Sequence, residues 1–106
     1  AFVNPPFGRA LGAWVACARE QGDRFGVASI LLVPARVDVA WWHDHVPFAI
    51  AVGFWKGRVT FVGAPAAAPF PVALIMFGPG GDAIWKARVA WQTKFRTALS
   101  GKCWIP

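Results

Sequence analysis

The sequence predicts an α/β fold built on a partly parallel sheet. Residues 1–3 have the character of the last residues of a strand, and residues 10–21 place their apolar side chains at helical spacing. Residues 27–33 form a continuous apolar run, which is typical of a strand buried on both faces. The order strand, helix, strand therefore indicates an α/β domain.

The boundaries of these elements have causes in the sequence. Pro5 and Pro6 end the first strand, because two successive prolines exclude regular strand pairing. We expect the first helix to end at Gly22 and the strand after it to end at Pro34. A short helix is expected over residues 39–45.

The middle of the chain predicts an antiparallel hairpin. Residues 48–55 form a second apolar run, and residues 58–62 carry apolar side chains on one side. Lys56 and Gly57 between them favour a turn, so these two segments are expected to pair. A loop rich in Ala and Pro follows, and residues 72–77 are expected to form a further strand.

The segment over residues 84–95 allows two interpretations. Apolar and polar residues alternate along most of it, which favours a strand. A helix is the alternative, with an apolar face made by Ile84, Ala87, Trp91, Phe95 and Leu99. We predict a strand, because a helix would turn Trp85 and Val89 towards the charged side.

Composition and charge limit the classes of function. The chain has 106 residues, is 57% apolar and carries a net charge of +6, so it is not a disordered tail. Residues 82–106 hold five Lys or Arg against one acidic residue, and such a basic end favours a polyanion such as DNA. The uncharged stretch over residues 59–81 is interrupted by four prolines, which argues against a membrane-spanning helix. We expect no membrane partner, and the first residues do not form a basic-then-apolar leader, so secretion is not indicated.

The motif with the clearest chemistry is Asn4-Pro5-Pro6-Phe7, which matches the Asn/Asp-Pro-Pro-aromatic signature of amino methyltransferases. The amino group of adenine is a poor nucleophile, because its lone pair is delocalised into the ring. The Asn4 side-chain oxygen and the Pro5 carbonyl are candidates to accept its two N–H groups. Pro6 holds Pro5 extended, and Phe7 offers a flat face for a base that has left the stack. The alternative is a simple turn.

Other patterns in the sequence have plainer explanations. Residues 78–83 fit G-x-G-x-x-A, but too few residues follow to complete a cofactor pocket. His43 and His45 would point apart on a helix, so we expect no metal site. Arg36 and Asp38 follow a strand at its carboxyl end. These two residues either form a local ion pair with each other or take part in binding DNA or a ligand in a pocket.

Several ordered segments accompany the Asn-Pro-Pro-Phe motif. Together they resemble the phage-type DNA N6-adenine methyltransferase family, often called the Dam family of phages. The resemblance covers about residues 2–79, and its segments are Asn4 to Arg9, Trp14-Val15, Leu32 to Trp42, Lys56 to Phe61 and Ala68 to Pro71.

The resemblance implies the catalytic-motif half of a Rossmann-like methyltransferase sheet, with an antiparallel hairpin near its C-terminal end. Residues 1–79 would form this half, and residues 80–106 a basic C-terminal extension. The cofactor would be S-adenosyl-L-methionine (AdoMet) and the partner double-stranded DNA, in the cytoplasm of a bacterial or phage-infected cell. We expect the half that binds AdoMet to be missing, which leaves Asn4 as the one candidate cofactor contact. Candidate DNA contacts are Arg9, Arg36, Lys56 and Arg58.

Two other functions remain open from the sequence. The same tetrapeptide type serves enzymes that methylate RNA or protein glutamine. A non-catalytic, basic DNA-binding module is the other alternative, in which the basic tail and exposed Trp side chains would supply the affinity.

Overall fold

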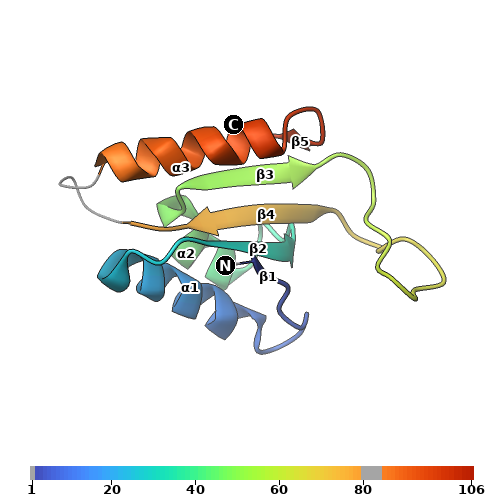
Figure 1. Cartoon of the computed structure of the whole chain (residues 1–106). Helices are drawn as coiled ribbons and strands as arrows, with labels where there is room; N and C mark the ends of the chain where they lie inside the picture. Colours follow the sequence, from blue (N-terminus) through green and yellow to red (C-terminus); the bar gives the residue numbers. More distant parts are fainter. Residues whose placement is uncertain (1, 80–84) are drawn as a thin grey trace.

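The computed structural model describes residues 2–79 and 85–106. In these residues the chain alternates strands and helices around one sheet (Figure 1). The elements are β1 (Phe2–Val3), α1 (Leu11–Phe25), β2 (Ser29–Pro34), α2 (Ala40–His45), the 3-10 helix η1 (Val46–Phe48), β3 (Ala51–Trp55), β4 (Val72–Phe77), α3 (Trp85–Ala98) and β5 (Cys103–Trp104).

The sheet is mixed, and its order is β1-β2-β4-β3-β5. β1 pairs with β2 in parallel, while β4 lies antiparallel between β2 and β3, and β5 runs antiparallel to β3. β1, β2 and β3 therefore point the same way, and their carboxyl ends meet at one side of the sheet. We call this side the carboxyl edge. The α/β class and the partly parallel sheet are confirmed.

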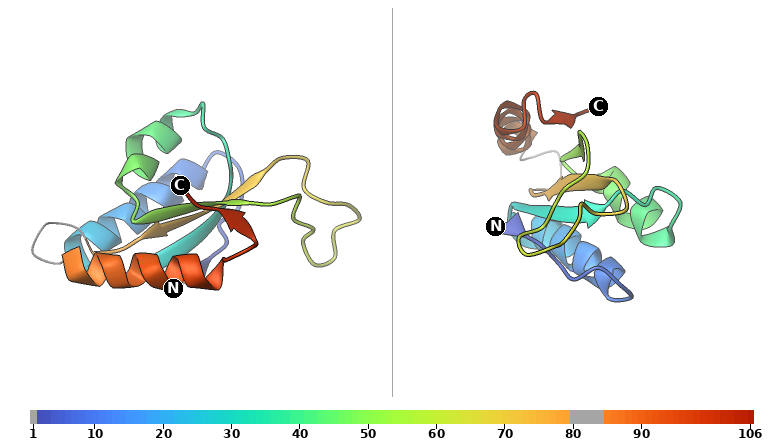
Figure 2. Two further views of the ribbon diagram at one scale, coloured as in Figure 1. Left: turned by 90° about the horizontal axis from the view of Figure 1, so that it is seen from above. Right: turned by 90° about the vertical axis from the view of Figure 1, so that its right-hand side faces the viewer.

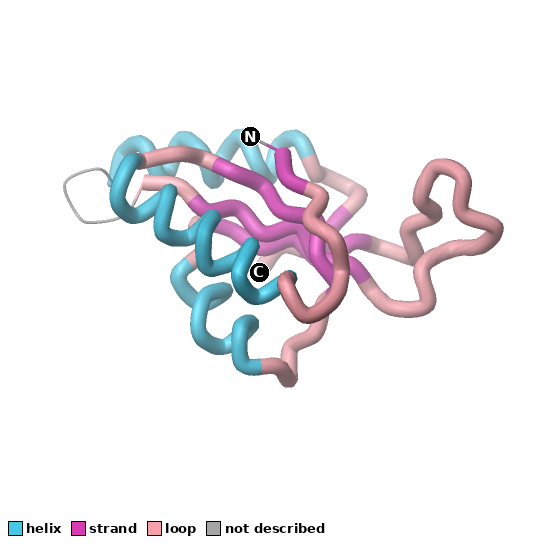
Figure 3. The backbone as a smooth tube through the Cα atoms, turned by 90° about the horizontal axis from the view of Figure 1, so that it is seen from below, coloured by secondary structure: helices cyan, strands magenta, loops and turns pink. Residues whose placement is uncertain are grey.

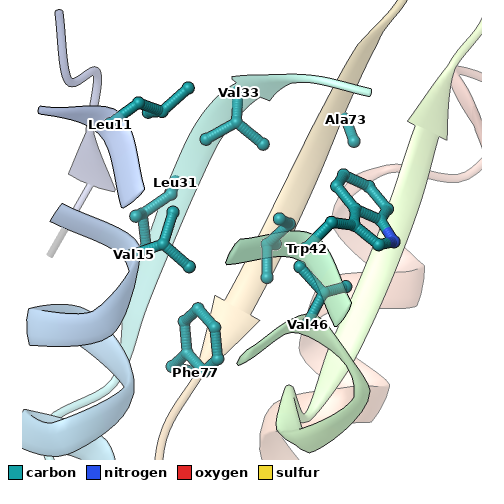
Figure 4. Close-up of a cluster of buried hydrophobic side chains, with 9 residues drawn as sticks. Leu11, Val15, Leu31, Val33, Trp42, Val46, Ala73 and Phe77 are labelled. Carbon is teal, nitrogen blue, oxygen red and sulfur yellow. The ribbon is translucent and has the colours of Figure 1, made fainter. Parts of the chain in front are cut away.

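Helices cover both faces of the sheet (Figure 2). α1 and α2 lie on one face and α3 on the other. The larger core lies under α1 and α2, where a buried cluster joins these helices to β2 and β4 (Figure 4). Its members are Leu11, Val15, Leu31, Val33, Trp42, Val46, Ala73, Ile75 and Phe77. A smaller cluster of Ile50, Leu74, Met76 and Phe95 lies under α3.

Helix α1 is longer than expected. It continues through Gly22 and ends at Gly26, which adopts the left-handed conformation at φ 66° and closes the helix. Gly22 is buried, and a Cβ there would stand 2.7 Å from the carbonyl oxygen of Gly78. The glycine expected to stop the helix instead lets it approach the end of β4 closely.

The predicted hairpin has a different second strand. Residues 58–62 form no strand, and β3 pairs with β4 instead, with Val52 opposite Ile75. Gly57 and Gly63 have φ of 84° and 82°, a backbone conformation that favours glycine and turns the chain away from the sheet. Residues 56–71 thus form a long loop that projects from the carboxyl edge (Figures 1 and 3).

The strand predicted over residues 84–95 is wrong, because residues 85–98 form α3. Phe95 is buried against Leu74 and Met76, and Trp91 and Leu99 stand one turn to either side of it. Packing against the open face of the sheet therefore outweighs the period-two pattern. Ile84 and residues 80–83 of the glycine pattern lie outside the described residues.

The C-terminal segment belongs to the same sheet. In β5, Cys103 pairs with Trp55 and Trp104 with Phe54, and the Lys56 backbone N–H donates to the Lys102 carbonyl at 2.9 Å. None of the described helices has the length and apolar composition needed to cross a lipid bilayer.

Candidate base-binding site

Three loops converge at the carboxyl edge. Residues 4–10 follow β1, residues 35–39 follow β2, and the long loop 56–71 follows β3. A hydrogen bond from the Ala35 N–H to the Pro71 carbonyl, at 2.9 Å, ties the second loop to the third. Ligands of α/β sheets usually bind beyond the carboxyl ends of strands, so this edge is where a site is expected.

The four residues of the Asn-Pro-Pro-Phe motif differ in exposure. Asn4 is exposed one residue after β1, and its side chain makes no hydrogen bond to another described residue. Pro5 is buried, Pro6 is exposed and Phe7 is half-buried. The amide of Asn4 is therefore available to a ligand, while Pro5 anchors the loop in the protein.

The ring of Phe7 packs inside an aromatic cluster. It lies 6.1 Å from the Phe61 ring in an edge-on arrangement and 5.5 Å from the Phe70 ring, centroid to centroid. Hydrogen bonds from the Ala68 N–H to the Val59 carbonyl and from the Ala64 N–H to the Phe61 carbonyl hold the loop that carries these rings. The sequence predicts that Phe7 offers a flat face to a base, and the structure adds that the long loop packs Phe61 and Phe70 against this ring.

A hollow of about 470 Å³ opens beside Phe7. Phe7 and Arg9 line it from one loop, Arg36 and Val39 from the next, and Trp41 from α2. The Arg36 guanidinium also lies 5.9 Å from the centre of the Phe70 ring. Two of the four predicted DNA contacts, Arg9 and Arg36, therefore border the same hollow as the motif.

The local ion pair considered for Arg36 is not formed. The two ion pairs among the described residues, Arg19–Asp23 and Arg24–Glu20, both lie within α1. Arg36 and Asp38 are both exposed and not paired with each other. Among the described residues, no carboxylate pairs with Arg36, so its positive charge faces the hollow and solvent.

Lys56 and Arg58 do not reach this hollow. Both are exposed, and Lys56 lines a second hollow of about 510 Å³ at the β3–β5 side of the carboxyl edge, together with Lys102, Trp55 and Trp104. Arg58 lines neither of these two hollows. The four predicted DNA contacts therefore do not lie together: Arg9 and Arg36 line one hollow and Lys56 lines the other.

No group of three or more potential metal ligands occurs among residues 2–79 and 85–106. The His45 ring lies within 3.4 Å of the Arg19 guanidinium, which also donates to the Asp44 carbonyl at 2.8 Å. The His43-Asp44-His45 segment therefore contributes to the contact between α1 and α2.

Phe61, Phe70 and Trp41 belong to the site but were not predicted as site residues. Phe61 and Phe70 lie in a segment expected to be a strand and a loop, and only its folding back onto Phe7 brings them near. Trp41 packs closely against α1. A Cβ added at Gly12 of that helix would lie 3.2 Å from the Cβ of Trp41. The sequence signal for one of them was the position of Phe70, an aromatic residue between two prolines in a loop.

Searches of protein-family models, curated proteins and solved structures gave no match to this chain. What the protein does must therefore be inferred from its residues and their arrangement.

Proposed function

We propose that this chain is the base-binding part of a DNA N6-adenine methyltransferase of the phage Dam type. The observations that carry the proposal are the exposed amide of Asn4, which bonds to no other described residue, and the hollow that opens beside Phe7 of the same motif at the carboxyl edge. The parallel pair β1–β2 and the antiparallel pair β3–β4 are compatible with the later strands of a Rossmann-like methyltransferase sheet. The Asn-Pro-Pro-Phe motif stands directly after β1, as the proposal requires.

The chemistry of the site suits an extruded adenine. Asn4 supplies an amide oxygen that accepts one N–H of the amino group, and the Pro5 carbonyl is the candidate acceptor for the other. Phe7 and Trp41 offer aromatic surface to the base, and stacking is worth about 1–3 kcal/mol per base. Arg9 and Arg36 bring positive charge for the flanking phosphates. These contacts would offset the cost of a few kcal/mol for extruding the base.

The same hollow does not suit AdoMet. Two guanidinium groups border it and no carboxylate lines it, so it repels the positive sulfonium of that cofactor. We therefore assign the hollow to the nucleic acid, and a methyl donor would need a pocket formed by other residues. The role proposed for this chain is to hold the amino nitrogen in place for attack, which depends on positioning more than on a strong base.

The test of the proposed function measures how much more tightly the chain binds a base that carries the amino group of adenine than one that lacks it. We expect the chain to bind a duplex with adenine opposite an abasic position more tightly than one with purine there, because purine lacks the amino group. The difference should be about tenfold, as for one hydrogen-bonded contact of about 1.4 kcal/mol. Asn4→Ala should reduce this difference, because it removes one of the two acceptors of the amino group, and should leave the free energy of unfolding unchanged, because Asn4 is exposed. Fluorescence anisotropy of labelled duplexes measures both affinities.

Gln21→Ala is the matched control, because it removes an exposed amide from α1. It should leave the preference for adenine intact. Equal binding of adenine and purine by the unaltered chain would refute the proposal. Tight, strongly salt-dependent binding without such a preference would instead favour the non-catalytic DNA-binding module.

In any longer form that transfers methyl groups from labelled AdoMet, Asn4→Ala should abolish transfer. Offering DNA, RNA and protein in that assay separates the three substrate classes.

A further inference from the structure

The second hollow, at the β3–β5 side of the carboxyl edge, combines positive charge with an exposed aromatic ring. Lys56 and Lys102 line it, both exposed and neither in an ion pair with another described residue. Trp104 also lines it and is 66% exposed. Exposed aromatic surface beside two cations is the combination that a polyanion with planar groups would contact.

The ring of Trp104 is held in a fixed orientation. It stacks on the Phe54 ring at a centroid distance of 5.4 Å and an interplanar angle of 28°. The strand pairing of Phe54 with Trp104 sets this stack, and the Lys56–Lys102 backbone hydrogen bond holds the adjacent residues. Because Phe54 occupies one side and the residue remains two-thirds exposed, the other side of the ring is open to a planar ligand.

An aromatic row connects this hollow with the one beside Phe7. Trp41, which lines the Phe7 hollow, lies 5.8 Å from Trp42, and Trp42 lies 6.2 Å from Phe54. The Phe54–Trp104 stack completes the row. Three ring contacts therefore join a residue of one hollow to a residue of the other, and Trp41, Trp42 and Phe54 of this row pack with the larger core on the face that α2 covers.

We propose that Lys56, Lys102 and Trp104 form a second binding site, which takes an unpaired strand of DNA. The two ammonium groups would contact successive phosphates, and an unpaired base would stack on the open side of Trp104. A positively charged groove with aromatic platforms is the usual means of binding single strands without sequence preference. This inference extends the proposed function to a second contact on the same polymer, and rests on it only for the choice of DNA.

The test uses a short labelled oligo-dT, which has no adenine and is independent of the Asn4 site. Trp104→Leu keeps apolar contact with Phe54 but removes the aromatic face, and should weaken binding about tenfold, within the range for base stacking. Its dependence on salt should not change. Trp104→Phe should retain most of the affinity. Lys102→Ala should reduce the slope of log K against log salt by about 0.7, the value for one phosphate contact on a single strand.

Two variants elsewhere on the molecule serve as controls. Trp14→Leu changes an exposed Trp on α1, and Lys94→Ala an exposed Lys on α3. Neither should alter the affinity or the salt slope appreciably. The proposal is overturned if Trp104→Leu, shown by circular dichroism to be folded, binds oligo-dT as well as the unaltered chain. It is also overturned if Lys94→Ala lowers the slope as much as Lys102→Ala, because binding would then follow overall charge.

Discussion

Neighbouring residues at the carboxyl edge differ in exposure, and exposure determines which of them can contact a ligand. Asn4 is exposed and free to bind, whereas Pro5 beside it is buried and holds the loop. Cys103 shows the same principle in β5. Burial raises the pKa of its thiol above the ordinary value of 9.0, and the neighbouring Lys102 ammonium opposes this by favouring the thiolate.

The pKa of Cys103 gives a pH-dependent prediction. In a Cys17→Ser variant the alkylation rate of Cys103 should rise with pH, because the thiolate is the reactive form. Its midpoint should lie above pH 9.0, since burial disfavours the charged form. Iodoacetamide labelling followed by mass spectrometry measures the rate. Lys102→Ala should move the midpoint higher still, and a midpoint below 9.0 in the Cys17→Ser variant would contradict the burial of this thiol.

At the scale of elements, α3 illustrates how packing selects between two local patterns. The alternation over residues 84–95 favours a strand, but β4 presents Leu74 and Met76 on a face that otherwise lacks cover. A helix covers that face with Phe95. A single added strand would cover much less of this surface.

Substitutions at Val89 distinguish the helix from the strand. Val89 lies in α3, is 47% exposed, and its carbonyl accepts a hydrogen bond from the Thr93 hydroxyl. Val89→Pro should lower the free energy of unfolding by about 3 kcal/mol or more, because proline interrupts the interior of a helix. Val89→Ala should change it by less than about 0.7 kcal/mol, since alanine favours helices. Urea denaturation followed by circular dichroism measures both, and a loss of about 1 kcal/mol or more for Val89→Ala would support the strand, because valine is the better strand former.

For the whole molecule, the packing between layers fixes the relation of the two hollows. Trp42 is buried in the larger core, beside Ala73 and Val46 (Figure 4), and it also contacts Trp41 and Phe54 in the aromatic row between the hollows. α2 therefore places Trp41 at the hollow beside Phe7 and packs against the Phe54 ring on which Trp104 stacks. Arg19 contributes to this placement from α1, because it bonds the Asp44 carbonyl and lies 3.9 Å from the centre of the Phe48 ring.

Truncation of Arg19 should destabilise the whole fold. Arg19→Ala removes the bond to Asp44 and the contact with Phe48, and should lower the free energy of unfolding by about 1–3 kcal/mol. Arg24→Ala is the control on the same helix. Arg24 pairs with exposed Glu20 and lies 5.4 Å from the centre of the exposed Phe25 ring, and such surface contacts are worth about 0.5 kcal/mol each. Chemical denaturation measures both losses, and equal losses would show that Arg19 does not link α1 to α2.

The sequence by itself determined the α/β class, the strand at residues 72–77 and the position of the Asn-Pro-Pro-Phe motif after a strand. These features depend on local patterns, namely apolar runs and prolines, whose effects reach only a few residues along the chain. Only the tertiary structure decided that α3 is a helix, that β3 pairs with β4, and that Phe61 and Phe70 support Phe7. Those outcomes depend on contacts between residues distant in sequence, and burial against a particular surface outweighs local propensity there.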